Sequence, residues 1–147
     1  MIIIPDANFI ISSLIRKGKS LELFEDNDIL GRIKFVAPED LSIEVKRNIP
    51  LIIGKSDLLE SEIVELLDKI ESQIEFVPKQ VFKKFLKKAI EVSPPNDFPY
   101  VALSLFLKSK GKNPRILSND KELLNSLSKV NVRGISIHDL LKELKLV

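Results

Sequence analysis

Apolar residues recur along the chain in two alternating patterns, which predict strands and helices in turn. Short runs of β-branched and aromatic residues predict buried strands, and apolar residues every three or four positions predict amphipathic helices. The predicted strands are residues 1–5, 32–38, 74–78, 114–120 and 132–137. The predicted helical stretches are residues 8–15, 20–28, 38–49, 57–72, 79–92, 97–110, 121–127 and 138–144.

This order of elements predicts an α/β fold. Strands that alternate with helices favour right-handed crossovers and parallel pairing, with helices on both faces of the sheet. We therefore expect a three-layer α/β/α sandwich around a central, mostly parallel sheet of about five strands. At 147 residues, without repeats or a long linker, residues 1–147 are expected to form one domain.

The stretch 79–92 is the most regular amphipathic pattern. One face is predicted to be apolar, with Val81, Phe82, Phe85, Leu86 and Ala89. The opposite face carries four lysines, Lys83, Lys84, Lys87 and Lys88. We expect a single helix there, with its apolar face on the core.

Composition narrows the class of protein. Hydrophobic residues make up 44% and charged residues 30%, which is typical of a globular protein and excludes a disordered one. No apolar run approaches the roughly 18–20 residues of a membrane span, and no signal-peptide pattern begins the chain, so a cytoplasmic location without membrane contact is expected. The chain has no Cys, which excludes disulfides, thiol catalysis and Cys-ligated metals. A metal ion would need oxygen ligands or the single histidine, His138.

Acidic residues follow predicted strands or begin predicted helices at four places. Asp6 comes directly after the first strand, and Asp120 is the last residue of the fourth predicted segment, after its apolar residues. Glu44 and Asp97 lie in helices that are positioned to reach the same edge. Because parallel sheets bind ligands at the carboxyl ends of their strands, the four acids form a candidate cluster.

Each acid also has a simpler structural explanation. Asp6 is a candidate N-cap, with Asn8 as its competitor, and Asp97 is a candidate cap of the helix that follows it. Glu44 is placed to pair with Arg47 three residues later, an interaction worth only about 0.2–0.5 kcal/mol.

The fourth acid has a similar alternative. Asn119 and Glu122 form a pair like a capping box, which would leave Asp120 as an ordinary acid of the first helical turn. Capping does not explain, however, why an almost wholly apolar helix should begin with Asp97.

Four segments together resemble the PIN-domain family, metal-dependent nucleases that include the VapC-type toxins of toxin–antitoxin pairs. The segments are "IIIPDANFII", "LSIEV", "NDFPYVALSL" and "ILSNDKELL". The resemblance covers essentially the whole chain, and it depends on four acids in the expected order and structural context.

The resemblance implies a metal-dependent endoribonuclease, either a toxin or an RNA-processing enzyme, that binds one or two Mg²⁺ or Mn²⁺ ions. RNA is the implied substrate, and an antitoxin and a second copy of the chain are the implied protein partners. The implied metal-binding and catalytic residues are Asp6, Glu44, Asp97 and Asp120. The implied supporting residues are Asn8, Ser118 and Asn119.

Coordination chemistry agrees with this implication. Mg²⁺ and Mn²⁺ prefer oxygen ligands, so a cluster of carboxylates without Cys suits them better than zinc. Such an ion activates water and neutralises charge during phosphodiester hydrolysis. Without metal the carboxylates would repel one another and raise some of their pKa values.

Basic residues give two candidate nucleic-acid surfaces. The first is the lysine face of residues 83–88, whose alternative is an ordinary solvated helix side. The second is Arg16, Lys17 and Lys19, just beyond the first helix, which we expect to lie nearer the acids. Two further residues have structural interpretations: His138 as a surface residue of the last helix, and Tyr100 as a core aromatic rather than a base-stacking one.

Other acidic α/β classes fit less well. A phospho-accepting receiver domain needs an Asp after the third strand, where this chain has Pro78 and Lys79, and a haloacid-dehalogenase-type phosphatase needs a second acid at Asn8. No P-loop or glycine-rich dinucleotide turn is present. The main alternative is a PIN-like scaffold that binds RNA or protein with weak catalysis.

Overall fold

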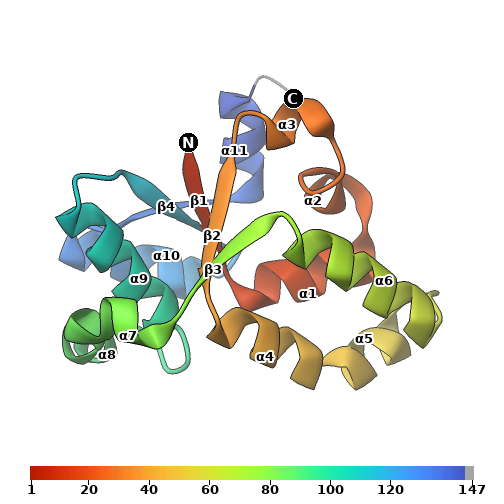
Figure 1. The fold of residues 1–147 in the computed structure, drawn as a ribbon, viewed down its shortest axis with the longest axis horizontal. Helices are drawn as coiled ribbons and strands as arrows, with labels where there is room; N and C mark the ends of the chain where they lie inside the picture. The colour runs from red at the N-terminus through yellow and green to blue at the C-terminus, as the bar shows by residue number, and fades with distance from the viewer. Residues whose placement is uncertain (145–147) are drawn as a thin grey trace.

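The structure, a computed structural model that describes residues 1–144, sets a five-stranded sheet between layers of helices (Figure 1). The strand order is β3-β2-β1-β4-β5, and every neighbouring pair is parallel. The strands are β1 (Ile2–Pro5), β2 (Lys34–Pro38), β3 (Ile74–Val77), β4 (Pro114–Leu117) and β5 (Arg133–Ile135). The predicted three-layer α/β/α architecture is thereby confirmed.

The helices divide between the two faces of this sheet. In Figure 1, α1, α4, α5 and α6 gather on one side, and α7, α8 and α9 on the other. The α-helices are α1 (Ala7–Arg16), α2 (Gly18–Glu22), α3 (Asn27–Leu30), α4 (Asp40–Arg47), α5 (Ile49–Lys55), α6 (Glu60–Glu71), α7 (Lys79–Phe82), α8 (Leu86–Val92), α9 (Phe98–Ser109), α10 (Lys121–Leu127) and α11 (Ile137–Glu143). Two short 3₁₀ helices are η1 (Lys83–Phe85) and η2 (Ser128–Val130).

Strand β1 is the central strand and is covered on both faces. Ile3 and Ile4 are 0% exposed, because helices pack on either side of them. The strand pairs with β2 on one edge and β4 on the other, with Pro5 opposite Leu117. This burial explains why the chain begins with a run of isoleucines rather than with alternating residues.

Two predicted helices are wrong in detail. Residues 79–92 form α7, η1 and α8 rather than one helix, because the backbone leaves helical geometry at Phe82 (φ −111°, ψ 15°). A 3₁₀ helix has about 3.0 residues per turn instead of 3.6, so side chains before and after it no longer lie on one helix face. Val81 is therefore 43% exposed and not part of the apolar face. Similarly, residues 20–28 divide between α2 and α3, with Phe24 filling the core from the turn between them.

Helix α9 is the most deeply placed helix. Residues 100–103 are all 0% exposed, and Pro99 occupies its first turn, where a missing N–H costs nothing. Gly111 adopts φ +80°, which lets the chain reverse into β4. Although α9 is strongly apolar, no helix within residues 1–144 combines the length and hydropathy needed to cross a bilayer.

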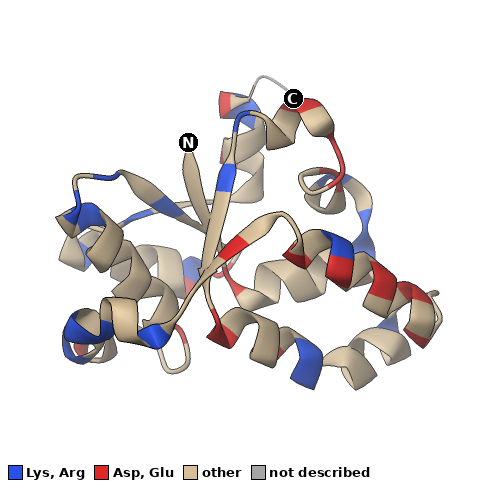
Figure 2. Ribbon diagram, viewed as in Figure 1, with Lys and Arg blue, Asp and Glu red and all other residues tan. Residues whose placement is uncertain are grey.

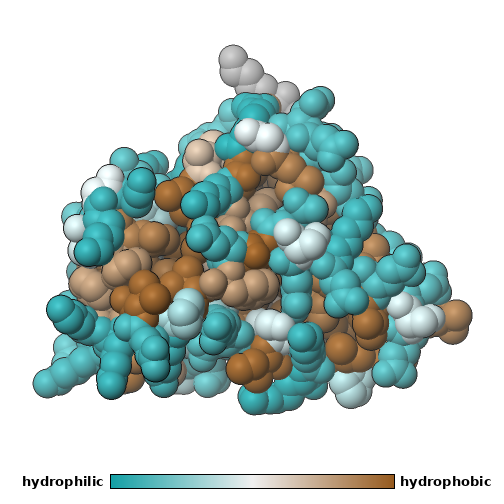
Figure 3. All heavy atoms as spheres, viewed as in Figure 1, coloured by the Kyte–Doolittle hydropathy of each residue, from teal (hydrophilic) through white to brown (hydrophobic). Residues whose placement is uncertain are grey.

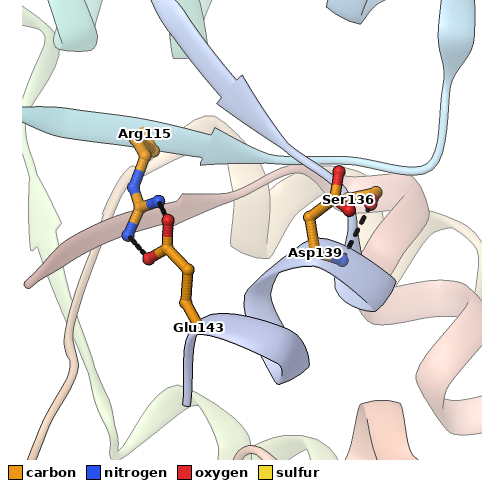
Figure 4. Close-up of polar contacts among 4 residues, drawn as sticks. All are labelled: Arg115, Ser136, Asp139 and Glu143. Carbon is orange, nitrogen blue, oxygen red and sulfur yellow. Dashed lines mark hydrogen bonds and ion pairs between the residues drawn. The ribbon is translucent and has the colours of Figure 1, made fainter. Parts of the chain in front are cut away.

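The last helix, α11, is tied to the sheet by an ion pair (Figure 4). Arg115 of β4 donates from both guanidinium Nη atoms to the carboxylate of Glu143, at 2.6 and 2.7 Å. At the other end of the helix, the hydroxyl of Ser136 accepts from the backbone N–H of Asp139 at 3.2 Å. The Arg115 side chain is only 9% exposed, so Glu143 neutralises a nearly buried charge.

Candidate active site

The ends of strands β1 and β4 bring the first and fourth acids together. Because Pro5 lies opposite Leu117, the residues that follow, Asp6 and Ser118, are neighbours at the carboxyl edge of the sheet. The backbone N–H of Asp6 continues the ladder by donating to the Leu117 carbonyl at 3.1 Å. The buried Ser118 hydroxyl donates to the Asp6 carboxylate and accepts from the Asp120 N–H at 3.0 Å. One serine therefore links the two acids.

Asp6 and Asp120 both act as helix caps. Oδ1 of Asp6 accepts from the Phe9 N–H at 2.7 Å, at the start of α1. Oδ1 of Asp120 accepts from the N–H groups of Glu122 and Leu123 at 2.9 and 3.3 Å, at the start of α10. The expected capping box of Asn119 is therefore wrong, because the chain enters the helix one residue later. These capping bonds use only Oδ1 of each acid.

Capping does not explain Asp97 and Glu44. Asp97 lies at the N-cap position of α9, but its side chain makes no capping hydrogen bond. Its backbone is helical (φ −95°, ψ −8°) rather than extended, so the carboxylate does not fold back over the first turn. Glu44 lies within α4, and Oε1 accepts from the Tyr100 hydroxyl at 3.4 Å, a long contact. Arg47 is only the smallest influence on the pKa of Glu44.

The four acids interact electrostatically. Burial is the largest cause that raises the pKa of Asp97 to about 7, followed by the charges of Asp6, Asp120, Glu44 and Glu122. All of these causes act in the same direction. The structure thus brings the four predicted acids to one place, and it adds Glu122, which the sequence suggested only as a capping residue.

The pKa values of Asp6 and Glu44 are also raised, in each case mainly by burial. For Asp6, hydrogen bonds from Ser118 and Phe9 partly offset the effect, while the charge of Asp120 adds to it. For Glu44, the Tyr100 hydroxyl partly offsets the burial. Perturbed carboxylates that converge in one place are typical of functional sites.

These donors suit a hard divalent cation. All four are carboxylates, the charges of the other three help to raise the pKa of Asp97, and a bound cation would remove the repulsion. Within residues 1–144, however, no three Asp, Glu, His or Cys side chains stand ready to hold a metal ion. Binding therefore requires the carboxylates to turn toward a common point.

Tyr100 connects α9 to this site. The residue is fully buried, which confirms a core aromatic and leaves no face for base stacking. Its hydroxyl donates to Glu44 and accepts from the Ala7 N–H. This supporting contact was missed from the sequence, although Asp97 and Tyr100 are three residues apart and so share one helix face.

A groove of about 430 Å³ opens beside Glu44, between α4 and the segment before α9. Its lining includes a cation, two amides and a partly exposed aromatic ring, which are Arg47, Asn48, Asn96 and Phe98. Asn96 has φ +73°, a left-handed conformation that the turn into α9 imposes. The sequence did not predict this groove, because its walls lie far apart along the chain.

The predicted basic surfaces are placed differently relative to the acids. Helix α1 starts next to Asp6 and leads away, so Arg16 lies about 14 Å along the axis at 1.5 Å per residue. The expectation that Arg16, Lys17 and Lys19 lie nearer the acids is therefore not supported. Lys83, by contrast, lines a hollow together with Glu39, which directly follows β2.

The remaining predicted residues lie on the surface. Asn8 and Asn119 are exposed and follow the ends of β1 and β4. Lys84, Lys87 and Lys88 are exposed, as either interpretation of the lysine face allows. His138 lies in the first turn of α11, in agreement with its predicted place on the last helix.

Comparisons with known proteins agree with this geometry. A family model described as PIN domain matches residues 4–138. The crystal structure of PAE2754 from Pyrobaculum aerophilum is similar, with a TM-score of 0.65 and 16% identity over 99% of this chain and 90% of that chain. The crystal structure of VapBC2 from Rickettsia felis, bound to a DNA fragment from their promoter, is also similar. Its TM-score is 0.59 and its sequence identity 11%, over 92% of this chain and 98% of that chain. The search among curated proteins gave no match.

Proposed function

The chain belongs to the PIN domain family, and from this premise we propose that it is a Mg²⁺- or Mn²⁺-dependent endoribonuclease. One observation carries the proposal: four acids from separate parts of the chain lie together at the carboxyl edge, where burial and then the charges of neighbouring acids raise the pKa of Asp97 to about 7. Burying acids beside one another costs stability, and proteins accept such a cost mainly at functional sites.

The residues that would hold the metal are Asp6, Glu44, Asp97 and Asp120. The bound ion would supply charge neutralisation at the reacting phosphate and a water of lowered pKa. Four carboxylates provide enough oxygen ligands for one or two such ions.

Side chains around these acids fix their positions. Ser118 holds Asp6 and the backbone of Asp120 in one arrangement, and Tyr100 holds Glu44 through its hydroxyl. These contacts keep Asp6 and Glu44 at the site, so that metal binding needs only a local turn of their carboxylates. Supporting contacts of this kind orient metal ligands.

The groove beside Glu44 is the proposed place for the nucleotide next to the scissile bond. Phe98 offers a face for a base, the amides of Asn48 and Asn96 offer hydrogen bonds, and Arg47 offers a charge for a phosphate. The Asn48 amide donates one N–H to the backbone carbonyl of Glu44 at 2.8 Å, so its second N–H and its carbonyl oxygen are left for a ligand.

The test is cleavage of labelled single-stranded RNA by the purified protein. We expect cleavage with Mn²⁺, none in EDTA, and none with Asp97→Asn. Asp68→Asn, which removes an exposed acid of α6, is the matched control and should cleave normally. Cleavage that persists in EDTA or in Asp97→Asn would exclude the metal-nuclease proposal. Single-stranded DNA in the same assay tests whether the substrate is RNA.

The second candidate function is a scaffold that binds RNA or protein. RNA binding without cleavage in Mn²⁺ would favour it, whereas cleavage would reject it. The occupied acidic positions argue for catalysis, because a scaffold gains nothing from mutually repelling carboxylates.

Two protein partners complete the proposal, a second copy of the chain and a cognate antitoxin. The observation behind both is exposed apolar surface on α4, α5 and the segment before α6, seen as brown residues along the lower edge of Figure 3. Ile43, Leu51 and Leu59 are 57%, 44% and 69% exposed. Light scattering of the purified protein tests the dimer, and rescue of growth by a neighbouring small gene tests the antitoxin.

A further inference from the structure

A pocket at the amino-terminal edge of the sheet lies far from the acids and has the opposite charge. It encloses about 150 Å³ between the end of α9, the start of β4 and residues 131–133. Its polar lining residues are Ser104, Lys108, Lys112, Asn113, Asn131 and Arg133. Within residues 1–144 its lining contains three cations and no acid. Figure 2 shows blue bands in this part of the molecule, on the end of α9 and the connection to β4.

The hydroxyl of Ser104 points to a ligand for this pocket. Ser104 is 2% exposed, yet among the described residues its side chain has no hydrogen-bond partner. Among residues 1–144, every polar side-chain atom that is fully shielded from solvent has a hydrogen-bond partner. Because the Ser104 oxygen has none, it must keep a small solvent-accessible surface, and Ser104 lines the pocket. Ser13, also buried in a helix, satisfies its hydroxyl by donating to the Phe9 carbonyl at 2.8 Å. A nearly buried hydroxyl without a protein partner is explained by a bound water, ion or ligand group.

The cations are held around the pocket. Nζ of Lys108 donates to the Asn131 carbonyl at 2.5 Å, which fixes its ammonium group at the wall. Lys112 and Arg133 are exposed at the rim, where each can contact an anion while it remains partly hydrated. The resulting arrangement of three cations, two amides and a hydroxyl is suited to the oxygen atoms of a phosphate.

Two helices lead from the acids to the pocket. Helix α9 begins after Asp97 and reaches the pocket at Lys108, about 17 Å away at 1.5 Å per residue. Helix α10 begins after Asp120 and leads through η2 to Asn131, the same number of residues away.

A groove of about 360 Å³ accompanies α10 along this course. It is lined near the acids by Glu122 and farther along by Asn125, Ser126 and Lys129. Lys129, two residues before Asn131, is the one cation among the groove's described lining residues. Glu91 and Glu122 also line the groove, so it attracts an anion less strongly than the pocket does.

We propose that this pocket binds a backbone phosphate of a single-stranded RNA whose scissile bond lies at the acids. The inference rests on the proposed nuclease function. At roughly 3.4 Å of rise per stacked nucleotide, 17 Å corresponds to about five nucleotides. The pocket therefore favours long substrates over short ones and contributes to binding rather than to the chemical step.

The binding experiment compares RNAs of about 4 and about 16 nucleotides, followed by fluorescence anisotropy in EDTA. Lys112→Gln combined with Arg133→Gln should weaken binding of the long RNA about tenfold near 0.1 M salt and lower the salt slope by about 1.4. The short RNA should be unaffected. Lys55→Gln combined with Lys69→Gln removes the same charge on the opposite side of the sheet and should change neither RNA. Equal weakening by both pairs would show a general charge effect and overturn the proposal.

Ser104→Ala tests the pocket without changing any charge. It should weaken binding of the long RNA severalfold, with no loss of thermal stability, because the hydroxyl has no protein partner to lose. Inorganic phosphate should compete with long RNA only weakly, since one phosphate of a chain gains from its neighbours. Phosphate that binds as tightly as the long RNA would instead assign the pocket to a free anion and overturn the RNA proposal.

These results are distinguishable from failure of the nuclease function. If wild type fails to cleave in Mn²⁺ but its long-RNA binding depends on the pocket, only the nuclease function fails. If wild type cleaves both lengths and the pocket variants bind and cleave like wild type, the pocket proposal alone is overturned.

Discussion

Replacing Asp97 by asparagine should stabilise the metal-free protein. The pKa of Asp97 is raised from 3.8 to about 7 by burial and by neighbouring acids. At about 1.36 kcal/mol for each pH unit between two pKa values, the rise corresponds to about 4 kcal/mol. Because the carboxylate keeps part of its surface in solvent, screening reduces this to about 2 kcal/mol. The amide side chain of asparagine has a similar shape and no charge, so it removes the penalty without opening a cavity.

The sign depends on pH. Between pH 3.8 and about 7 the folded protein holds the Asp97 proton more tightly than the unfolded chain does, so this residue makes stability fall as pH rises. Below pH 3.8 the carboxyl is neutral in both states and the penalty is absent. The Asp97→Asn variant should therefore melt like wild type near pH 4 and about 4–8 °C higher at pH 8.

Thermal melts in EDTA at both pH values measure this difference, with Asp68→Asn as the control for loss of an exposed acid. Mn²⁺ should raise the melting temperature of wild type at pH 8 and raise that of Asp97→Asn much less. A variant that melts below wild type at pH 8 in EDTA would refute the repulsion argument, because it would show that Asp97 stabilises the fold. That result would return Asp97 to a capping or other structural role.

Three further changes test supporting contacts. Tyr100→Phe removes the hydroxyl that donates to Glu44, and we expect about a tenfold loss of RNA cleavage with at most about 1–2 kcal/mol of stability, measured by initial rates and melts. Glu143→Gln leaves the nearly buried Arg115 without its charged partner and should cost about 1 kcal/mol at pH 7. Since the hydrogen bond from Arg115 lowers the pKa of Glu143, the difference from wild type should disappear as pH falls below that pKa in acid melts. Gly134→Ala would place a Cβ 2.5 Å from a leucine methyl group and should cost about 1–2 kcal/mol in urea unfolding; a neutral result would mean that the leucine turns away freely.

The position of the acids could be predicted from the sequence because it follows from strand order and direction. Asp6 and Asp120 come directly after strands, and the carboxyl ends of neighbouring parallel strands meet at one edge. Asp97 could be placed because the apolar helix after it had to lie against the sheet. These predictions needed only local patterns and the handedness of crossovers.

Other features depend on contacts that local patterns do not contain. The break at Phe82 replaces a regular helix pattern because burial of that ring overrides the periodicity around it. The contact of Tyr100 with Glu44 joins residues 56 positions apart. The direction of α1, by contrast, was available from the sequence: a helix that starts beside Asp6 must lead Arg16 away from it.

Helices α1 and α9 both begin at the acidic edge, and their direction affects how the site survives without metal. The aligned peptide dipoles of a helix give its amino end about half a positive charge. Two such ends face the carboxylates and offset part of their repulsion before any ion arrives. The protein is therefore expected to fold without metal and to bind the proposed ion afterwards, unlike small zinc domains, which need their ion to fold. Metal exchange at such a site is expected to be reversible, so metal supply would act as a switch on a protein that is already folded.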